Sequence, residues 1–466
     1  MTDRRLIEDS LPLRVISDES RREKSLRHGH ISTLHIWWAR RPLAACRAAI
    51  YAALRPAPSD TQTRADEHAL IADLVKWEAT LPDAMEKNSV AKARQRVLEA
   101  NVARRGHNVP PAVLDPFAGG GAIPLEAGRL GCVAIANDLN PVAHIIELAT
   151  LRFAQRFSDL RTAAPVSLLG DAGGKPLLIE ALEWCLGRVQ HDVERSVRDL
   201  YPSVRGEKVL GYIWARTVVC PNPACRAEIP LMGQWWLAKK KNKKVALRPV
   251  ANTEQGRVDF DIAYEADIDF DASAGSMSRS NALCPCCGQV CPAKVIREFG
   301  VRGEIGYRLV SVVIDKPGVS GKDYRAPTHE ELSAATQRAE RRLGEIREAT
   351  RDGIPLIPDE ELPYLRSIFN VHVYGYRTWA SLFTPRQLVT ICAFVEGVRN
   401  TREAVADKYR ERAGERASEF ADAVTTLAAF VVDRVINQSN AFTRWNNAGE
   451  KAEGIFSRQA LGMLWD

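Results

Sequence analysis

The chain has 466 residues, of which 45% are hydrophobic and 26% are charged. This composition is typical of a globular protein and excludes collagen-like and intrinsically disordered classes. The net charge of +6 is compatible with a polyanionic partner but does not by itself indicate one. No apolar run reaches the roughly 18 residues that a membrane span needs, and the polar start MTDRRLIEDS is no signal peptide. We therefore expect a cytoplasmic protein without membrane contact.

The amino-terminal region, residues 1–105, is predicted to be a helical domain. Within it, HISTLHIWWARRPLAACRAAIYAALRP has a helical periodicity that ends at Pro56. This segment also contains a tryptophan pair beside Arg40 and Arg41. The arginines could hold DNA phosphates or a cofactor carboxylate. Alternatively, the tryptophans belong to the core and the arginines form surface ion pairs, and both interpretations stay open.

Residues 106–205 contain the motif VLDPFAGGGAIPLEA, which predicts a cofactor-binding segment. We expect a strand over 112–114, a glycine turn, a helix through Arg129 and a second strand over 132–136. Because Gly119, Gly120 and Gly121 lack Cβ atoms, a ligand can lie directly against the backbone of this turn. The start of the following helix offers free N–H groups to a negatively charged group.

An acid stands at the end of each of these strands, Asp115 after the first and Asp138 after the second. In a doubly wound sheet, the second acid faces the ribose of a bound nucleoside. A nicotinamide enzyme would carry Gly-x-Gly-x-x-Gly/Ala, but Pro124 occupies the last position. The form Asp-Pro-Phe-x-Gly-x-Gly, which includes Phe117, is similar to the S-adenosylmethionine loop of amino-methylating DNA methyltransferases. An ordinary βα turn without a ligand is the remaining alternative.

Residues 206–301 contain two compact cysteine pairs, CPNPAC and CPCCG, within a pattern of short strands. In a reducing compartment, pairs with this spacing indicate a closed, structural zinc site of four thiolates. The predicted ligands are Cys220, Cys225, Cys284 and Cys287. Cys286 and Cys291 are additional thiols close by, and buried cysteines without a metal are the alternative.

The sequence WWLAKKKNKKVALR lies between the cysteine pairs and combines tryptophans with clustered lysines. Such a combination fits phosphate contacts and base stacking on nucleic acid. A solvated hairpin tip would have the same composition without any partner. The candidate nucleic-acid contacts are Lys239, Lys240, Lys241, Lys243 and Lys244, with Arg40 and Arg41.

Residues 302–466 are predicted to be mixed at first and then helical. IGYRLVSVVID has the pattern of a strand, and Thr328 begins a helix with a glutamate three residues on, as in a capping box. A second helix begins at Thr384 and Pro385, and an apolar helix covers residues 415–436.

Together these segments resemble one family, the adenine-specific DNA methylases that carry a zinc ribbon and an amino-terminal domain of uncharacterised function. The matching segments are HIWWARRPLAACRA, VLDPFAGGGAIPLEA, NDLNPVA, WARTVVCPN, WLAKKKNKKVALRP, CPCCG, LFTPRQL and RQALGMLWD. The resemblance implies an α/β fold with a class I, Rossmann-like methyltransferase core and the adenine amine of DNA as methyl acceptor. The three glycines would hold the methionine moiety of S-adenosylmethionine, Asp115 its amino group and Asp138 its ribose. Some relatives are similar to methylases of phage-defence systems.

The sequence departs from this family at one motif. Amino-methyltransferases bind the target base with Asp/Asn-Pro-Pro-Tyr/Phe, and no such tetrapeptide occurs in the sequence. In the family order it would follow RQALGMLWD, so we expect an incomplete core, either truncated or one half of a split enzyme whose catalytic motif lies on a downstream polypeptide. We expect no methyl transfer by the chain alone. A second hypothesis is a non-enzymatic, zinc-stabilised DNA-binding subunit of a methylase or phage-defence system.

Overall fold

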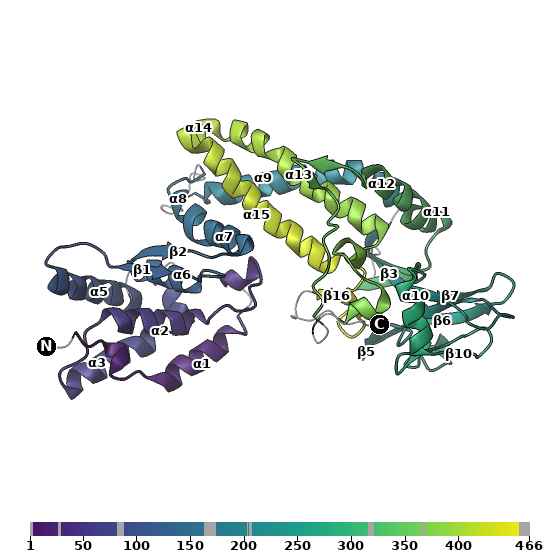
Figure 1. Cartoon of the computed structure of the whole chain (residues 1–466), viewed down its shortest axis with the longest axis horizontal. Helices are drawn as coiled ribbons and strands as arrows, with labels where there is room; N and C mark the ends of the chain where they lie inside the picture. Colours follow the sequence, from purple (N-terminus) through teal and green to yellow (C-terminus); the bar gives the residue numbers. More distant parts are fainter. Residues whose placement is uncertain are drawn as a thin grey trace. The chain divides into compact units, whose positions relative to one another are not determined.

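The computed structural model describes residues 3–26, 29–81, 88–162, 174–202, 204, 207–315, 321–365, 368 and 370–455. The chain forms two compact units (Figure 1). Unit 1 comprises Met1–Trp184 and Arg402–Phe430, and unit 2 comprises Cys185–Thr401 and Val431–Asp466. Both units contain helices and strands, so the protein is of the mixed α/β class. Among the described residues, no helix combines the length and apolarity that crossing a membrane requires.

Unit 1 packs its amino-terminal helices around α2. The helices of this unit are α1 (Leu13–Glu23), α2 (Leu43–Leu54), α3 (Thr61–Leu74), α5 (Ser89–Arg105), α6 (Ala122–Arg129), α7 (Pro141–Glu147), α8 (Ala154–Arg156) and α14 (Arg410–Ala413). α2 contacts α1, α3, α5 and α6, as Figure 1 shows. Its alanine-rich sequence is apolar on nearly every side, which suits a helix enclosed by neighbours.

The helix predicted over residues 30–56 is shorter in the structure and begins only at Leu43. Pro42 precedes it, and a proline disfavours helical geometry in the residue before it. The carboxylate of Glu23 accepts hydrogen bonds from the N–H groups of Leu43 (2.9 Å) and Ala44 (3.1 Å), which caps the helix. The preceding segment is therefore irregular, with a 3-10 turn over Ile31–Thr33 and a second turn in which the Arg40 N–H donates to the Trp37 carbonyl oxygen at 3.2 Å.

A parallel two-stranded sheet follows these helices. β1 (Ala112–Asp115) pairs with β2 (Val133–Ala136), and α6 connects the two strands. The predicted order of strand, glycine turn, helix and strand is thus confirmed. Among the described residues this sheet has only these two strands, so a complete Rossmann-like core is not shown.

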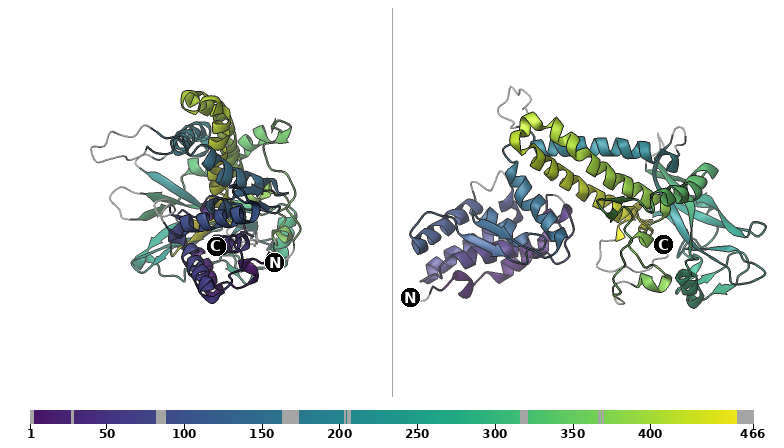
Figure 2. Two further views of the ribbon diagram at one scale, coloured as in Figure 1. Left: turned by 90° about the vertical axis from the view of Figure 1, so that its left-hand side faces the viewer. Right: turned by 45° about the horizontal axis from the view of Figure 1, so that its top comes forward.

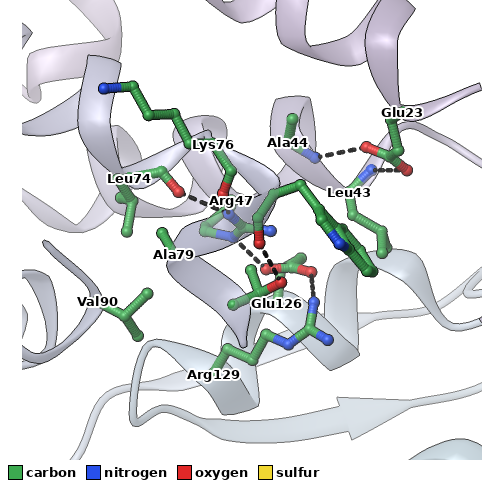
Figure 3. Close-up of polar contacts among 12 residues, drawn as sticks. Glu23, Leu43, Ala44, Arg47, Leu74, Lys76, Ala79, Val90, Glu126 and Arg129 are labelled. Atoms are coloured by element: carbon green, nitrogen blue, oxygen red, sulfur yellow. Dashed lines mark hydrogen bonds and ion pairs between the residues drawn. The ribbon is translucent and has the colours of Figure 1, made fainter. Parts of the chain in front are cut away.

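A buried ion cluster joins α6 to α2 (Figure 3). The Nε atom of Arg47 lies 2.6 Å from one carboxylate oxygen of Glu126, and the Arg129 guanidinium pairs with the other oxygen. Arg47 also donates to the carbonyl oxygen of Leu74 at 2.6 Å. Glu126 is 0% exposed and Arg47 is 1% exposed. Removing one partner from such a pair costs about 3–5 kcal/mol because an uncompensated buried charge remains.

Three long helices contribute residues to both units. They are α9 (Leu177–Ser196), α13 (Pro385–Lys408) and α15 (Ala417–Gln438). α13 begins as predicted, because the Thr384 hydroxyl accepts from the Gln387 N–H while the Gln387 side chain accepts from the Thr384 N–H.

Unit 2 is built on a mixed seven-stranded sheet with the order β12-β11-β3-β4-β7-β6-β5, visible in teal in Figure 2. The strands are β3 (Lys208–Val219), β4 (Glu228–Leu231), β5 (Trp236–Lys240), β6 (Lys243–Asn252), β7 (Arg257–Tyr264), β11 (Gly306–Asp315) and β12 (Lys322–Arg325). Only β4 and β7 pair in parallel. β3 and β11 form a long antiparallel pair and come from opposite sides of the cysteine-containing region.

A smaller sheet in unit 2 carries the second cysteine pair. Its strands are β8 (Met277–Ser278), β9 (Asn281–Leu283) and β10 (Val290–Cys291), followed by α10 (Ala293–Val301). The remaining elements are α11 (His329–Ser333), α12 (Ala339–Ile346), β13 (Thr350–Arg351), β14 (Ile354–Pro355), β15 (Arg444–Asn446) and β16 (Lys451–Glu453). The predicted capping box of Thr328 and Glu331 is present at α11.

Candidate cofactor site and metal centre

The glycine turn of unit 1 has the backbone geometry that only glycine adopts without strain. Gly119 has a φ of +55°, and Gly121, which caps α6, has a φ of +73°. Asp115 ends β1 and accepts a hydrogen bond from the N–H of Phe117 at 3.1 Å. The ring of Phe117 is 85% exposed, so a ligand at the turn can reach it.

Asp138 is held against the same turn. Its carboxylate accepts from the N–H of Gly119 and from the N–H of Asn140, each at 2.8 Å. These backbone donors, Asn140 foremost, hold the pKa of Asp138 below its usual range. Asp138, the acid predicted after the second strand, is therefore ionised. It lies beside the glycine turn that was predicted to follow the first strand.

Two side chains of the amino-terminal segment lie directly on the turn. A Cβ atom on Gly119 would come within 2.6 Å of Nε1 of Trp37, and one on Gly120 would come within 2.8 Å of Nε of Arg40. Trp37 also packs against the buried apolar cluster that contains Phe430. The glycines thus allow close packing of this segment, in which Trp37 is partly buried against the core and Trp38 is 46% exposed.

Arg40 and Arg41 occupy different environments although they are adjacent in sequence. Nε and Nη1 of Arg40 are buried and have no hydrogen-bond partner among the described residues. Burial lowers the pKa of Arg40 to about 10, although the guanidinium stays charged near neutral pH. Arg41 is exposed. The structure therefore places Arg40 at the glycine turn and Arg41 on the surface.

Glu147, the last residue of α7, borders the turn and was not predicted from the sequence. Its Cγ atom would lie 3.7 Å from a Cβ atom on Gly121, and the residue is 5% exposed. Its Oε1 atom has no hydrogen-bond partner in the described part of the chain. Burial first, and then the negative charges of Asp138 and Asp115, raise the pKa of Glu147 to about 7. The only sequence signal was a single acid within the apolar run IIELAT.

The four predicted zinc ligands converge in unit 2. The Sγ atoms of Cys220 and Cys287 are 3.7 Å apart, those of Cys225 and Cys284 are 3.8 Å apart, and all four lie within 4.8 Å of one another. A Zn–S bond of about 2.3 Å requires a sulfur–sulfur distance of about 3.8 Å in a tetrahedron. The four thiols therefore fit one structural zinc ion.

Backbone turns aim these thiols inward. Gly288, with a φ of +70°, closes the second knuckle by donating its N–H to the Cys284 carbonyl oxygen at 2.8 Å. The pKa of the Cys287 thiol is lowered to about 7, mainly because its sulfur accepts a hydrogen bond from the Gln289 N–H. The two additional thiols point elsewhere: Cys286 faces the Arg257 carbonyl oxygen at 3.6 Å, and Cys291 is fully buried in β10.

The predicted lysine cluster forms the β5–β6 hairpin, and its members have different roles. Lys240 and Lys243 both pair with Glu450, which is 3% exposed, and the Lys243 pair measures 2.7 Å. Lys239 lies over the Trp236 ring at 5.2 Å. Lys239, Lys241 and Lys244 are exposed, so these three present positive charge to solvent.

One cavity of about 850 Å³ lies in unit 2, between β3, the start of α13 and the end of α15. The side chain of Arg386 lines it and stacks 4.1 Å from the Tyr212 ring centroid. Burial lowers the pKa of Arg386. None of the site residues predicted from the sequence is among the residues that line this cavity.

One segment of the chain matches a known protein family. Residues 10–79 match a family model described as a protein of unknown function (DUF1156). This stretch contains Glu23, Trp37, Arg40 and Arg47. No methylase family was matched. Comparisons with curated proteins and with solved structures give no match. The segment RQALGMLWD, which contributed to the resemblance, lies outside the described residues.

We expect the purified chain to carry one zinc ion. Cys284→Ser should remove the metal and lower the thermal unfolding midpoint of unit 2 by at least about 5 °C, because metal binding contributes to folding. Cys286→Ser is the matched control and should keep the metal. Elemental analysis by mass spectrometry, combined with thermal melts, measures both effects. A Cys284→Ser protein with unchanged zinc content would contradict this assignment.

Glu147 makes the stability of unit 1 depend on pH. Its pKa is raised in the folded state to about 7, so the folded state holds the proton more tightly than the unfolded chain does. Stability should therefore fall as the pH rises from about 4.5 to 7. Glu147→Gln should remove this fall and stabilise the protein at pH 8 by about 1–3 kcal/mol, with little effect near pH 4.5. Urea unfolding at several pH values measures the difference, and equal stability of both proteins at pH 8 would refute it.

Proposed function

We propose that unit 1 binds S-adenosylmethionine at the glycine turn. The observation that carries the proposal is the group of acids at this turn: Asp138 accepts from the Gly119 N–H at 2.8 Å, Asp115 ends the preceding strand, and the buried Glu147 lies beside Gly121. A nucleotide pyrophosphate carries no positive charge to offset these acids, whereas Arg40 at the turn could pair with only one anionic group, so net repulsion is expected where burial lowers the dielectric constant. A sulfonium and an ammonium group would instead be attracted. The charge pattern thus favours the methionine cofactor over a nicotinamide dinucleotide.

The residues of the turn would divide the contacts with the cofactor. Gly119, Gly120 and Gly121 would let the methionine moiety approach the backbone, and Asp115 would orient its amino group. Asp138 would accept from the ribose hydroxyls with lone pairs that its two backbone donors leave available. Phe117 would contact the cofactor from the exposed side.

The proposal includes a class I methyltransferase fold for unit 1. The parallel β1–β2 pair joined by α6, with an acid at the end of each strand, supports this assignment. When bound, the cofactor supplies a methyl group, and the resemblance of the sequence makes the adenine amine of DNA the proposed acceptor. The chain's contribution would be positioning of the two reactants.

Unit 2 would hold a structural zinc ion and contact DNA. Zinc on the four cysteines would hold the connection between β3 and β4 against the turn between β9 and β10. Lys239, Lys241 and Lys244 would contact phosphates, while Trp236 offers a ring for stacking. Lys240 and Lys243 would stabilise the hairpin through Glu450.

A non-enzymatic DNA-binding module is the second candidate. The contact of Trp37 and Arg40 with the glycine turn favours it, because this packing by itself requires glycine at positions 119 and 120. In that case unit 1 would be a scaffold without a cofactor, and the protein would act through unit 2.

Calorimetric titration separates the two candidates. We expect the chain to bind S-adenosylmethionine and S-adenosylhomocysteine but not NADH. Asp138→Ala should weaken binding about 10-fold or more, because the ribose loses charge-assisted hydrogen bonds. Asp66→Ala changes an exposed acid on α3 and should leave binding unchanged. A wild-type chain that binds neither methionine compound would leave the DNA-binding module as the function.

A second experiment tests the DNA contact. Lys241→Glu with Lys244→Glu should lower the affinity for duplex DNA about 10-fold or more at moderate salt, because phosphate contacts are lost. Lys92→Glu with Lys294→Glu changes the net charge equally at exposed positions elsewhere and should have a smaller effect. Fluorescence anisotropy measures both. Equal losses for the two double variants would show that only net charge matters.

A further inference from the structure

We propose that the segment joining α1 to α2 supplies the anion-binding half of the glycine-turn site, with Arg40 binding the carboxylate of the ligand's amino-acid moiety. The proposal rests on the cofactor function proposed above. This segment lies within residues 10–79, which match the family model of unknown function.

The first observation is that two buried atoms of the Arg40 guanidinium lack hydrogen-bond partners. Nε and Nη1 of Arg40 donate to no acceptor among the described residues, and Nη2 donates only a long hydrogen bond of 3.4 Å to the His35 carbonyl oxygen. Leaving buried guanidinium donors unpaired is costly in free energy. A carboxylate, with two oxygens that match the guanidinium fork, would satisfy these donors.

The second observation is the position of this guanidinium beside the start of a helix. Nε and Nη2 would each lie 2.8 Å from a Cβ atom on Gly120, one residue before the cap of α6. The first helical bond of α6 runs from the Leu125 N–H to the Gly121 carbonyl oxygen, so the N–H groups of Ala122 and Ile123 have no acceptor within the helix. A helix start with unpaired N–H groups favours an anion, and Arg40 adds a full positive charge there.

Glu23, the acid that ends α1, is already engaged elsewhere. Burial lowers the pKa of Arg40 and the charge of Glu23 partly opposes this, but the Glu23 oxygens accept from the N–H groups of Leu43 and Ala44 and contact the His30 ring at 2.8 Å. Glu23 therefore caps α2 and does not satisfy the Arg40 donors. The positive charge of Arg40 remains available to a ligand.

The charged side chains around the turn match a ligand that carries both a positive and a negative group. Glu147, 5% exposed and with an unpartnered Oε1 atom, lies with Asp115 and Asp138 on the acidic side, and Arg40 provides the basic side. A ligand with an ammonium or sulfonium group and a carboxylate within one amino-acid moiety would neutralise both. The ligand class is thus a nucleoside that carries an amino acid.

The segment is held in place before any ligand binds. The His30 ring bridges Glu23 (2.8 Å) and the Ser32 hydroxyl (2.6 Å), and Trp37 packs into the apolar cluster of Ile146. Because Trp37 fixes the backbone before Arg40 and the hydrogen bond from the Leu43 N–H to Glu23 fixes it after Arg40, little conformational entropy is lost when a carboxylate binds.

Two ligands that differ only in the amino-acid moiety test the proposal. S-adenosylhomocysteine carries the carboxylate, and methylthioadenosine keeps the nucleoside without it. Arg40→Met should weaken S-adenosylhomocysteine about 10- to 100-fold in calorimetric titration, since a charged hydrogen bond is lost. Binding of methylthioadenosine should stay unchanged, and Arg40→Lys should restore part of the lost affinity. Arg41→Met, the exposed neighbour, is the matched control and should change neither affinity.

The outcomes distinguish this inference from the proposed function. If Arg40→Met weakens both ligands equally, or lowers the thermal unfolding midpoint without selective loss, Arg40 is a structural residue and the inference is wrong. If Arg40→Met binds S-adenosylhomocysteine as the wild type does, the inference is wrong but the cofactor site stands. If the wild type binds neither ligand, the proposed function itself fails.

Discussion

The carboxylate of Glu126, enclosed between Arg47 and Arg129, fixes where the glycine turn lies in unit 1. Glu126 is on α6, the helix that begins at Gly121, so any shift of this carboxylate would move the turn. Because an unpaired charge at zero exposure is costly, the helix is confined to the one position in which both arginines reach it. The geometry of the candidate cofactor site depends on this ion cluster.

The same ion cluster also helps to position the stretch between α1 and α2 next to the glycine turn. Arg47 is on α2, and Glu23 caps α2, so the chain between α1 and α2 has a fixed start and a fixed end. Trp37 and Arg40 lie on this stretch and contact the glycine turn. The stretch and the turn are therefore packed against each other, although 79 residues separate Arg47 from Glu126.

The buried charged groups at the glycine turn differ in their pairing from those at the β5–β6 hairpin. In unit 1 the guanidinium of Arg40 and the carboxylate of Glu147 keep unpartnered atoms at the turn, which is a property of sites that bind ligands. In unit 2 Glu450 neutralises Lys240 and Lys243, and this pairing stabilises a hairpin. Unpartnered charged atoms thus mark the candidate site, whereas the paired charges of Glu126 in unit 1 and Glu450 in unit 2 support the fold.

The sequence alone determined features that depend on neighbours within a few residues. The glycine turn between its strands, the cap at Thr384 and the spacing within each cysteine pair follow from local geometry, so they could be predicted. Only the tertiary structure separated Arg40 from Arg41 and Lys240 from Lys241, and only it brought Glu147 to the turn. The physical reason is that their burial and pairing depend on distant residues: Glu450 is 210 residues from Lys240, and no local pattern encodes that contact.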